Sequence, residues 1–118
     1  MALQFSPGDD LIFQLESGYG LLRVLAVQGE GGAAVWHLLA YEELFPDVES
    51  AEAALAEPAR LTLRAPHLAL TDLALAKTPA ARLGNRPVRE EELAAYREWL
   101  ARGESPSERS ALLLLGLR

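Results

Sequence analysis

Two β-rich runs separated by a tight turn open the chain, and they limit most strongly what it can fold into. Large aliphatic and aromatic residues dominate residues 11–16, and residues 21–27 are apolar apart from Arg23. Between the runs stand Ser17-Gly18-Tyr19-Gly20, residue types that form turns. We therefore expect an antiparallel hairpin with strands at 11–16 and 21–28, a common start of a curved sheet or a small barrel.

A third strand is expected at residues 33–41, after a glycine-rich turn at 29–32. Successive side chains of a strand point to opposite faces. The alternation therefore predicts that one face carries Val35, His37, Leu39 and Tyr41, and that the other carries Trp36 and Leu38.

The rest of the chain supplies two more strands and three helices. Strands are expected at 60–65 and 81–86, and helices at 50–56, 89–102 and 106–115. Ser50 and Ser105 are the expected N-caps of the first and last helix, and Gly103 is expected to end the middle one. Residues 66–78 stay ambiguous, with Thr71 and Asp72 able to cap a brief helix. The prediction is one α+β domain, 1–118: a small antiparallel sheet of about five strands, strongly curved or an SH3-like barrel, with a C-terminal helix packed on it.

Charge is unevenly distributed along this acidic chain of net charge −6. Residues 1–59 hold ten acids and one base, whereas residues 60–89 hold six bases and one acid. A negative molecule repels nucleic acid and anionic lipid and attracts basic partners. No apolar run approaches the roughly 20 residues of a membrane span. The N-terminus also lacks a signal-peptide pattern, so a cytoplasmic location is expected.

Residue chemistry points away from catalysis. The chain has no cysteine, so disulfides, thiolate nucleophiles and cysteine metal sites are excluded. Neither glycine-rich segment leads into a helix as a phosphate-binding loop does, and no serine lies in a nucleophile elbow. His37 and His67 are the only histidines, and they lack a familiar metal-ligand spacing. We expect no catalytic residues, no metal and no cofactor, and interpret both histidines as structural.

Outward-facing arginines are the main candidates for an interaction surface. Arg60 and Arg64 share one strand face, and Arg82 and Arg86 repeat this spacing on the next predicted strand. If the two strands pair, a guanidinium patch results that could bind phosphates or an acidic peptide. The favoured interpretation is that these arginines meet the chain's own acids in segments 42–57 or 90–98. The candidate surface consists of Arg60, Arg64, Arg82, Arg86, Trp36, His37 and Tyr41, although the favoured interpretation of Trp36 and Tyr41 is that they belong to the core.

A resemblance to a known family adds to this interpretation. The order of Gly8-Asp9, a strand with Phe13, Gly18-Tyr19-Gly20 and Arg23-Val24-Leu25 resembles the start of the bacterial immunity-26-like family. It covers about the first third of the chain. The resemblance implies an SH3-like fold and a role in neutralising toxins of polymorphic toxin systems, and it implies no catalytic residues.

The expected function is therefore that of a bacterial, non-enzymatic protein-binding domain, as an immunity-type protein against a basic toxin. One alternative is a small nucleic-acid-associated barrel that uses Arg23 with the four strand arginines. Another is a ligand- or metal-binding protein built around His37 and His67. The leucine-rich C-terminus, Leu112 to Leu115, also makes a homodimer a candidate assembly, since consecutive leucines need cover.

Overall fold

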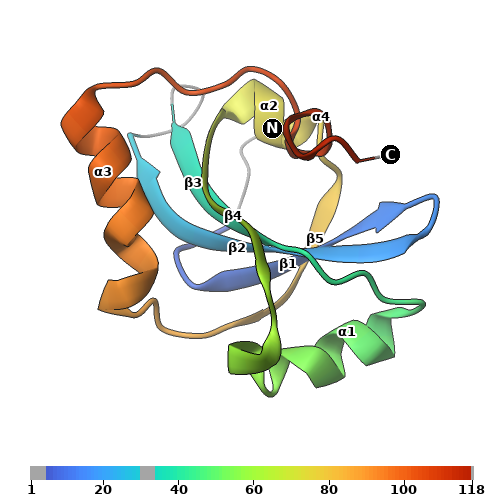
Figure 1. The fold of residues 1–118 in the computed structure, drawn as a ribbon. Helices are drawn as coiled ribbons and strands as arrows, with labels where there is room; N and C mark the ends of the chain where they lie inside the picture. Colours follow the sequence, from blue (N-terminus) through green and yellow to red (C-terminus); the bar gives the residue numbers. More distant parts are fainter. Residues whose placement is uncertain (1–4, 30–33, 118) are drawn as a thin grey trace.

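The computed structural model describes residues 5–29 and 34–117, which form one antiparallel sheet surrounded by short helices (Figure 1). The strands are β1 (Asp9–Leu15), β2 (Gly18–Gln28), β3 (Val35–Tyr41), β4 (Leu63–Thr71) and β5 (Ala80–Asn85), in the order β4-β3-β2-β1-β5. The predicted α+β class and five-stranded antiparallel sheet are confirmed. Since β4 and β5 are opposite edges, the sheet is not closed.

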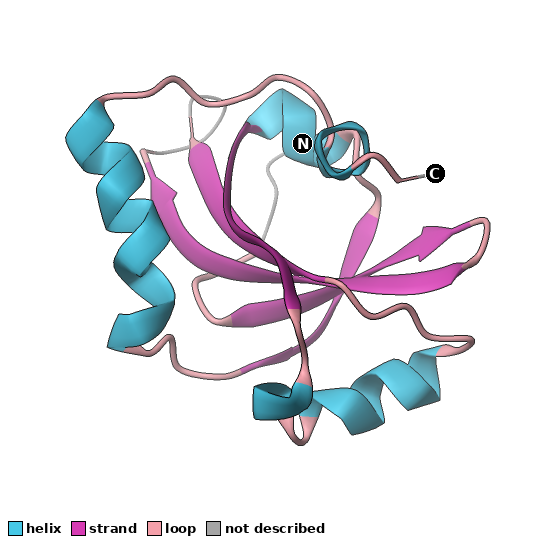
Figure 2. Ribbon diagram, in the orientation of Figure 1, coloured by secondary structure: helices cyan, strands magenta, loops and turns pink. Residues whose placement is uncertain are grey.

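Six short helical segments lie around the sheet. They are α1 (Val48–Leu55), η1 (Pro58–Arg60), α2 (Asp72–Ala76), η2 (Glu90–Leu93), α3 (Ala94–Arg102) and α4 (Ala111–Leu115), of which η1 and η2 are 3-10 helices. Figure 2 shows α3 along one side of the sheet, α1 and η1 below it, and α2 and α4 above it. In the described parts of the chain, no helix is long and apolar enough to cross a membrane.

The opening hairpin is present, but its turn is tighter than predicted. Leu15 pairs with Gly18, so Gly18 to Gly20 belong to β2 and not to the turn. Tyr19 explains this difference, because it exchanges two backbone hydrogen bonds of 2.8 Å with Phe45 and so lies in a bridge. Gly18 has a φ of 140°, a conformation that glycine adopts without steric cost.

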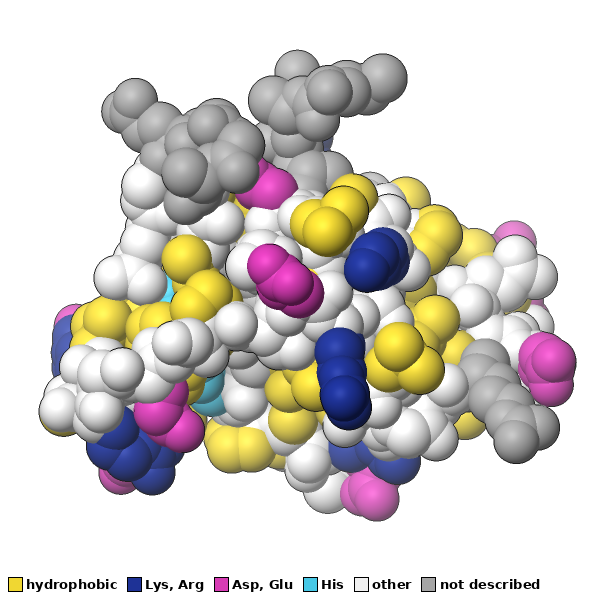
Figure 3. Space-filling view, turned by 90° about the horizontal axis from the view of Figure 1, so that it is seen from above, with side chains coloured by type: hydrophobic (Ala, Val, Ile, Leu, Met, Phe, Trp, Pro, Cys, Tyr) yellow, Lys and Arg dark blue, Asp and Glu magenta, His cyan; other side chains and the backbone are white. Residues whose placement is uncertain are grey.

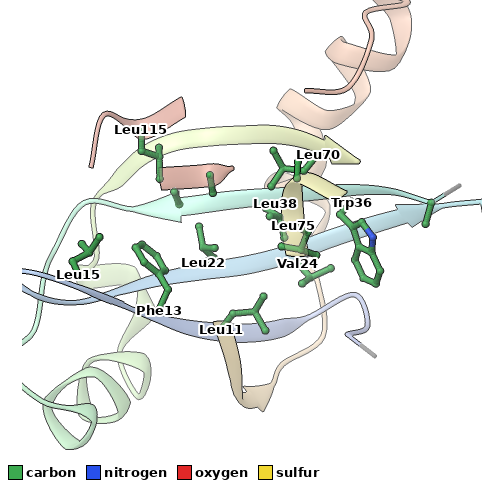
Figure 4. Close-up of a cluster of buried hydrophobic side chains, with 14 residues drawn as sticks. Leu11, Phe13, Leu15, Leu22, Val24, Trp36, Leu38, Leu70, Leu75 and Leu115 are labelled. Atoms are coloured by element: carbon green, nitrogen blue, oxygen red, sulfur yellow. The ribbon is translucent and has the colours of Figure 1, made fainter. Parts of the chain in front are cut away.

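The sheet separates two hydrophobic clusters, and β3 contributes to both as predicted. Trp36 and Leu38 face the first cluster, which Figure 4 shows between the sheet and the segments that carry Leu75 and Leu115. Leu39 and Tyr41 face the second cluster, together with residues of α1 and of η2. The expected glycine-rich turn at 29–32 and the start of this strand at Ala33 fall, from Glu30 onward, outside the described residues.

The predicted strand at 60–65 is misplaced. Arg60 ends the 3-10 helix η1, and β4 begins at Leu63 and continues to Thr71, through the segment whose structure was ambiguous in the sequence. Pro66 is tolerated within β4 because an edge strand does not need every N–H group for pairing. The pairing register between β3 and β4 shifts near this proline, between Leu38 and Ala40.

Three helix starts differ from the predictions. Asp47, not Ser50, caps α1, and its carboxylate accepts a hydrogen bond from the Ser50 N–H at 2.7 Å. The predicted helix 89–102 begins with the 3-10 turn η2. The predicted helix 106–115 is only α4, capped by Ser110. It starts late because Ser107 forms backbone hydrogen bonds to Ala69 and Thr71 and so extends the edge of β4.

The prediction that Gly103 ends the middle helix is confirmed. Gly103 follows α3 with a φ of 65°, the left-handed conformation typical of helix C-termini, and Gly116 ends α4 in the same way with a φ of 70°. Thr71 caps α2, where its hydroxyl accepts a hydrogen bond from the Ala74 N–H.

Candidate functional site

The four arginines proposed as one patch are dispersed. Those of the β4 region and those of the β5 region lie at opposite edges of the sheet, so the strand pairing that would gather them does not occur. Arg60 pairs with Glu57 at 3.1 Å, and Arg86 pairs with Asp10 at 2.7 Å. Arg82 lies 4.0 Å from Asp9, and Arg64 donates to the Leu115 carbonyl. The arginines thus mostly meet acids or carbonyls of their own chain, although two of the acids come from β1 and not from segments 42–57 or 90–98.

A buried arginine, proposed from the sequence only within the nucleic-acid alternative, organises the adjoining surface. Arg23, in the middle of β2, is only 1% exposed. It donates hydrogen bonds to Asp10 and Glu92, and to the carbonyls of Gly8, Arg86 and Pro87. This one side chain therefore attaches the segment between β5 and η2 to the sheet. The only sequence signal for it is a single cation inside an otherwise apolar strand.

Asp10 joins this network to a second arginine. Both of its carboxylate oxygens accept hydrogen bonds from Arg86, at 2.7 and 2.8 Å. Hydrogen bonding to Asp10 raises the pKa of Arg86, and burial opposes this shift only in part. For Glu92, burial favours the neutral acid, but the hydrogen bonds from Arg23 and from the Arg89 backbone lower the pKa overall. Both groups are therefore held in their charged forms.

Next to this network, the structure has a groove of about 430 Å³. We call it the α3–β4 groove, because α3 and η2 form one wall and η1 with the start of β4 forms the other. Leu39 and Tyr41 of β3 form its floor. Its lining consists of Leu39, Tyr41, Pro58, Ala59, Leu61, Leu63, Pro66, Arg86, Arg89, Glu91, Glu92, Ala94, Ala95 and Glu98. Of the residues proposed from the sequence, Tyr41 and Arg86 line this groove, while Arg60, Arg64, Arg82, Trp36 and His37 do not.

The two histidines meet beneath α3, although 30 positions separate them in the sequence. His37 Nδ1 lies 2.8 Å from His67 Nε2, and His37 Nε2 lies 2.6 Å from Gln28 Oε1. The ring planes differ by 16° and the centroids lie 5.1 Å apart, so the rings are nearly coplanar and face each other edge to edge. Because Gln28 Oε1 can only accept, His37 carries its proton on Nε2 and accepts a hydrogen bond from His67.

This histidine pair supports the packing of α3. His37 is fully buried, and its ring contacts the rings of Tyr96 and Trp99 at centroid distances of 4.3 and 4.9 Å. Burial lowers the pKa of His37 to about 4, and the neighbouring His67 adds to this effect. Within the described residues, no three histidine, aspartate or glutamate side chains come together to hold a metal ion. The geometry fits a structural hydrogen bond.

Trp36 also has a structural position. It is 4% exposed within the first hydrophobic cluster, and its indole N–H donates to Asp72 at 2.6 Å. Asp72 is the first residue of α2, so this bond joins α2 to β3.

The surface around α1 is acidic. Residues 42–57 carry six acids and no base. In this segment, the side chains of Leu44 and Val48 are 41% and 37% exposed. Partly exposed apolar side chains therefore lie among carboxylates on this surface.

Comparison with known proteins identifies no relative: no protein-family model, curated protein or solved structure matches this chain.

Proposed function

We propose that this protein is a non-enzymatic binding domain whose partner is a protein with a basic surface. The distribution of ion pairs is the observation that carries the proposal. Arginines of the described chain pair mainly with acids of the same molecule, and this leaves the excess negative charge on the surface. The acidic segment 42–57, around α1, concentrates much of it. Opposite charge on a partner speeds encounter and selects the correct partner.

The resemblance of the first third of the chain to immunity-26-like proteins gives a narrower form of the same proposal. In that form the partner is a basic toxin, and the protein neutralises it in the bacterial cytoplasm. An acidic surface with exposed apolar residues is what such a complex would use.

The ion pairs favour protein binding over the nucleic-acid alternative. Of the five arginines in that alternative, Arg23 is buried and Arg60, Arg82 and Arg86 already contact carboxylates, so within the described residues only Arg64 is without an ion pair to compete with phosphates. The alternative of a metal site has two converging imidazoles in its favour, but these already bond to each other.

Affinity capture with charge-reversed variants tests the proposed function. The protein would be immobilised, exposed to lysate of its native host at low salt, and any captured partner purified for a direct titration. Reversal of two exposed carboxylates of α1, Glu49→Lys with Glu52→Lys, should weaken this direct binding by about tenfold or more. Reversal of two exposed carboxylates elsewhere, Glu16→Lys with Glu108→Lys, gives the same net charge. This control should weaken the direct binding much less than the α1 variant does.

Two results would contradict the proposal. One is the failure to recover any protein that binds directly after purification. The other is that the protein shifts the mobility of single- or double-stranded nucleic acid at low salt, and that the α1 variant gives the same shift.

A further inference from the structure

We propose that the α3–β4 groove receives an apolar side chain, an aromatic one in particular, from a partner segment whose neighbouring residues are basic. The inference rests on the proposed function above, because it identifies where and how the basic partner docks.

The dimensions of the groove fit an anchor of this kind. A volume of about 430 Å³ lies in the range of sites that enclose a small ligand or a few side chains. Its floor is preformed, because Leu39 and Tyr41 are 3% and 7% exposed and belong to a strand inside the sheet. Two prolines in the wall formed by η1 and β4, Pro58 and Pro66, further restrict the backbone there. Little ordering would therefore be needed on binding.

The lining explains why the anchor should be apolar. Leu63, on the β4 wall, is 47% exposed, and Ala94 on the α3 wall is exposed as well. Leu61 and Ala95 complete a largely hydrocarbon surface between these walls. An inserted aromatic ring would remove this surface from water, and burial of apolar area is the main favourable contribution to such contacts.

The charges at the rim explain why the flanking residues should be basic. Each cation at the groove already contacts an anion: Arg86 contacts Asp10, and Arg89 contacts Glu91 at 3.1 Å. Glu98 of α3 has no ion-pair partner within the described residues. Glu43, which does not line the groove, binds the N–H of Thr62 at 2.9 Å, between Leu61 and Leu63 in the chain, and has no ion-pair partner within the described residues either. The unneutralised charge around the opening is therefore negative.

Synthetic pentapeptides test the groove directly. The probes are acetyl-Lys-Lys-Trp-Lys-Lys-amide, the same peptide with alanine in place of tryptophan, and the same peptide with glutamate in place of lysine. Each would be titrated into ¹⁵N-labelled protein at low salt. The tryptophan–lysine peptide should give saturable shifts in the backbone amides of Leu63, Ala94 and Ala95. Removal of either the ring or the positive charges should weaken binding by about tenfold.

Matched variants separate groove binding from general attraction. Ala94→Phe fills the groove and should weaken the tryptophan–lysine peptide by about tenfold, whereas Ala101→Phe adds the same ring to an exposed position of α3 outside the groove and should not. Glu98→Lys should weaken it by about threefold, and Glu108→Lys, of equal net charge, should have little effect. Amide spectra of each variant would establish that it is folded.

Several results would overturn the inference: equal binding of the alanine or glutamate peptide, shifts located away from the groove, or no saturation at millimolar peptide. Binding measurements with the captured partner distinguish failure of this inference from failure of the proposed function. If Ala94→Phe binds the purified partner as tightly as the unmodified protein does, the domain is a binding protein that docks elsewhere. If no partner exists but the peptide binds in the groove, the proposed function fails and the groove remains a peptide site.

Discussion

Arg23 shows how much of this fold depends on one charged side chain that is removed from water. A buried charge is costly unless it is paired and fully hydrogen-bonded. Arg23 meets both conditions through carboxylates of β1 and η2 and through backbone carbonyls. Through its bond to Glu92, Arg23 also holds in place the η2 part of the wall of the α3–β4 groove.

Replacement of this arginine by leucine should destabilise the protein by about 3–5 kcal/mol, because Glu92 keeps its burial and loses its main cation, and the Gly8, Arg86 and Pro87 carbonyls lose their donor. Asp10 keeps its hydrogen bonds to Arg86. Urea unfolding followed by circular dichroism measures this difference. Arg82→Ala is the control, since Arg82 is well exposed and lies 4.0 Å from its acid. The control should change stability by less than about 0.5 kcal/mol. A loss below about 1 kcal/mol for Arg23→Leu would contradict the interpretation.

The buried histidine should make stability depend on pH. The pKa of His37 is about 4 in the folded protein, against 6.5 when the histidine is free of these surroundings. Between these values the unfolded chain binds more protons than the folded one. Stability should therefore be greatest above about pH 7 and decrease as the pH falls towards 4, by at most about 3 kcal/mol.

His37→Phe should remove most of this decrease, because the substituted ring still packs on Tyr96 and Trp99 and does not titrate. The measurement is the free energy of unfolding in urea at several pH values between about 7 and 5, above the range in which carboxylates contribute most. Parallel pH profiles for the variant and the unmodified protein would show that His37 is not the titrating group.

At the scale of secondary-structure elements, the hairpin β1–β2 depends on close approach of a ring to the backbone. A Cβ atom added to Gly20 would lie 2.4 Å from the ring of Phe13, its neighbour across the pair. Gly20→Ala should therefore destabilise the protein by about 1–3 kcal/mol through overpacking. A Cβ atom added to Gly84 of β5 would have no neighbouring atom within 4 Å, so Gly84→Ala is the control. Thermal unfolding compares the two, and an equal loss of stability would disprove the contact.

The elements that local patterns determine were predicted, and those that distant segments determine were not. The alternation of His37, Leu39 and Tyr41 against Trp36 and Leu38 appears in the structure because each of these side chains is buried on one face or the other. The start of α4 could not be predicted, because the segment around Ser107 bonds to the last residues of β4 and is used there instead of in a helix.

The site follows the same rule. Tyr41 and Arg86 belong to the predicted surface and line the α3–β4 groove. One wall of the groove comes from α3, and the sequence predicts only that this helix packs on the sheet, not which part of the sheet it covers. Likewise, the contact between His37 and His67 requires the pairing of β3 with β4 and the local shift in their register. The residue types indicated which side chains could belong to a site. Which of these side chains lie next to one another depends on the tertiary structure.

At the scale of the whole molecule, exposed apolar side chains are distributed and not collected into one large surface. On the face over α2 and α4, Figure 3 shows apolar side chains interrupted by charged and polar ones. Two of the four consecutive leucines, Leu113 and Leu114, are 69% and 39% exposed, whereas Leu115 packs in the first hydrophobic cluster. The homodimer through this terminus stays a prediction, and sedimentation of the unmodified protein and Leu113→Lys would test it.

The acidic surface around α1 should lower stability, because its six carboxylates repel one another without a base in segment 42–57. Glu52→Lys should raise the free energy of unfolding at low salt by a few tenths of a kcal/mol, and added salt should remove the gain by screening. Glu108→Lys should not raise it, since Glu108 shares a hollow with Lys77 and Arg109. Urea unfolding at low and high salt measures both. Where surface charge serves binding, the charge is expected to lower the free energy of unfolding, so that a single charge reversal raises it. If the stability of Glu52→Lys is unchanged or lower, the case that these carboxylates serve binding is weakened.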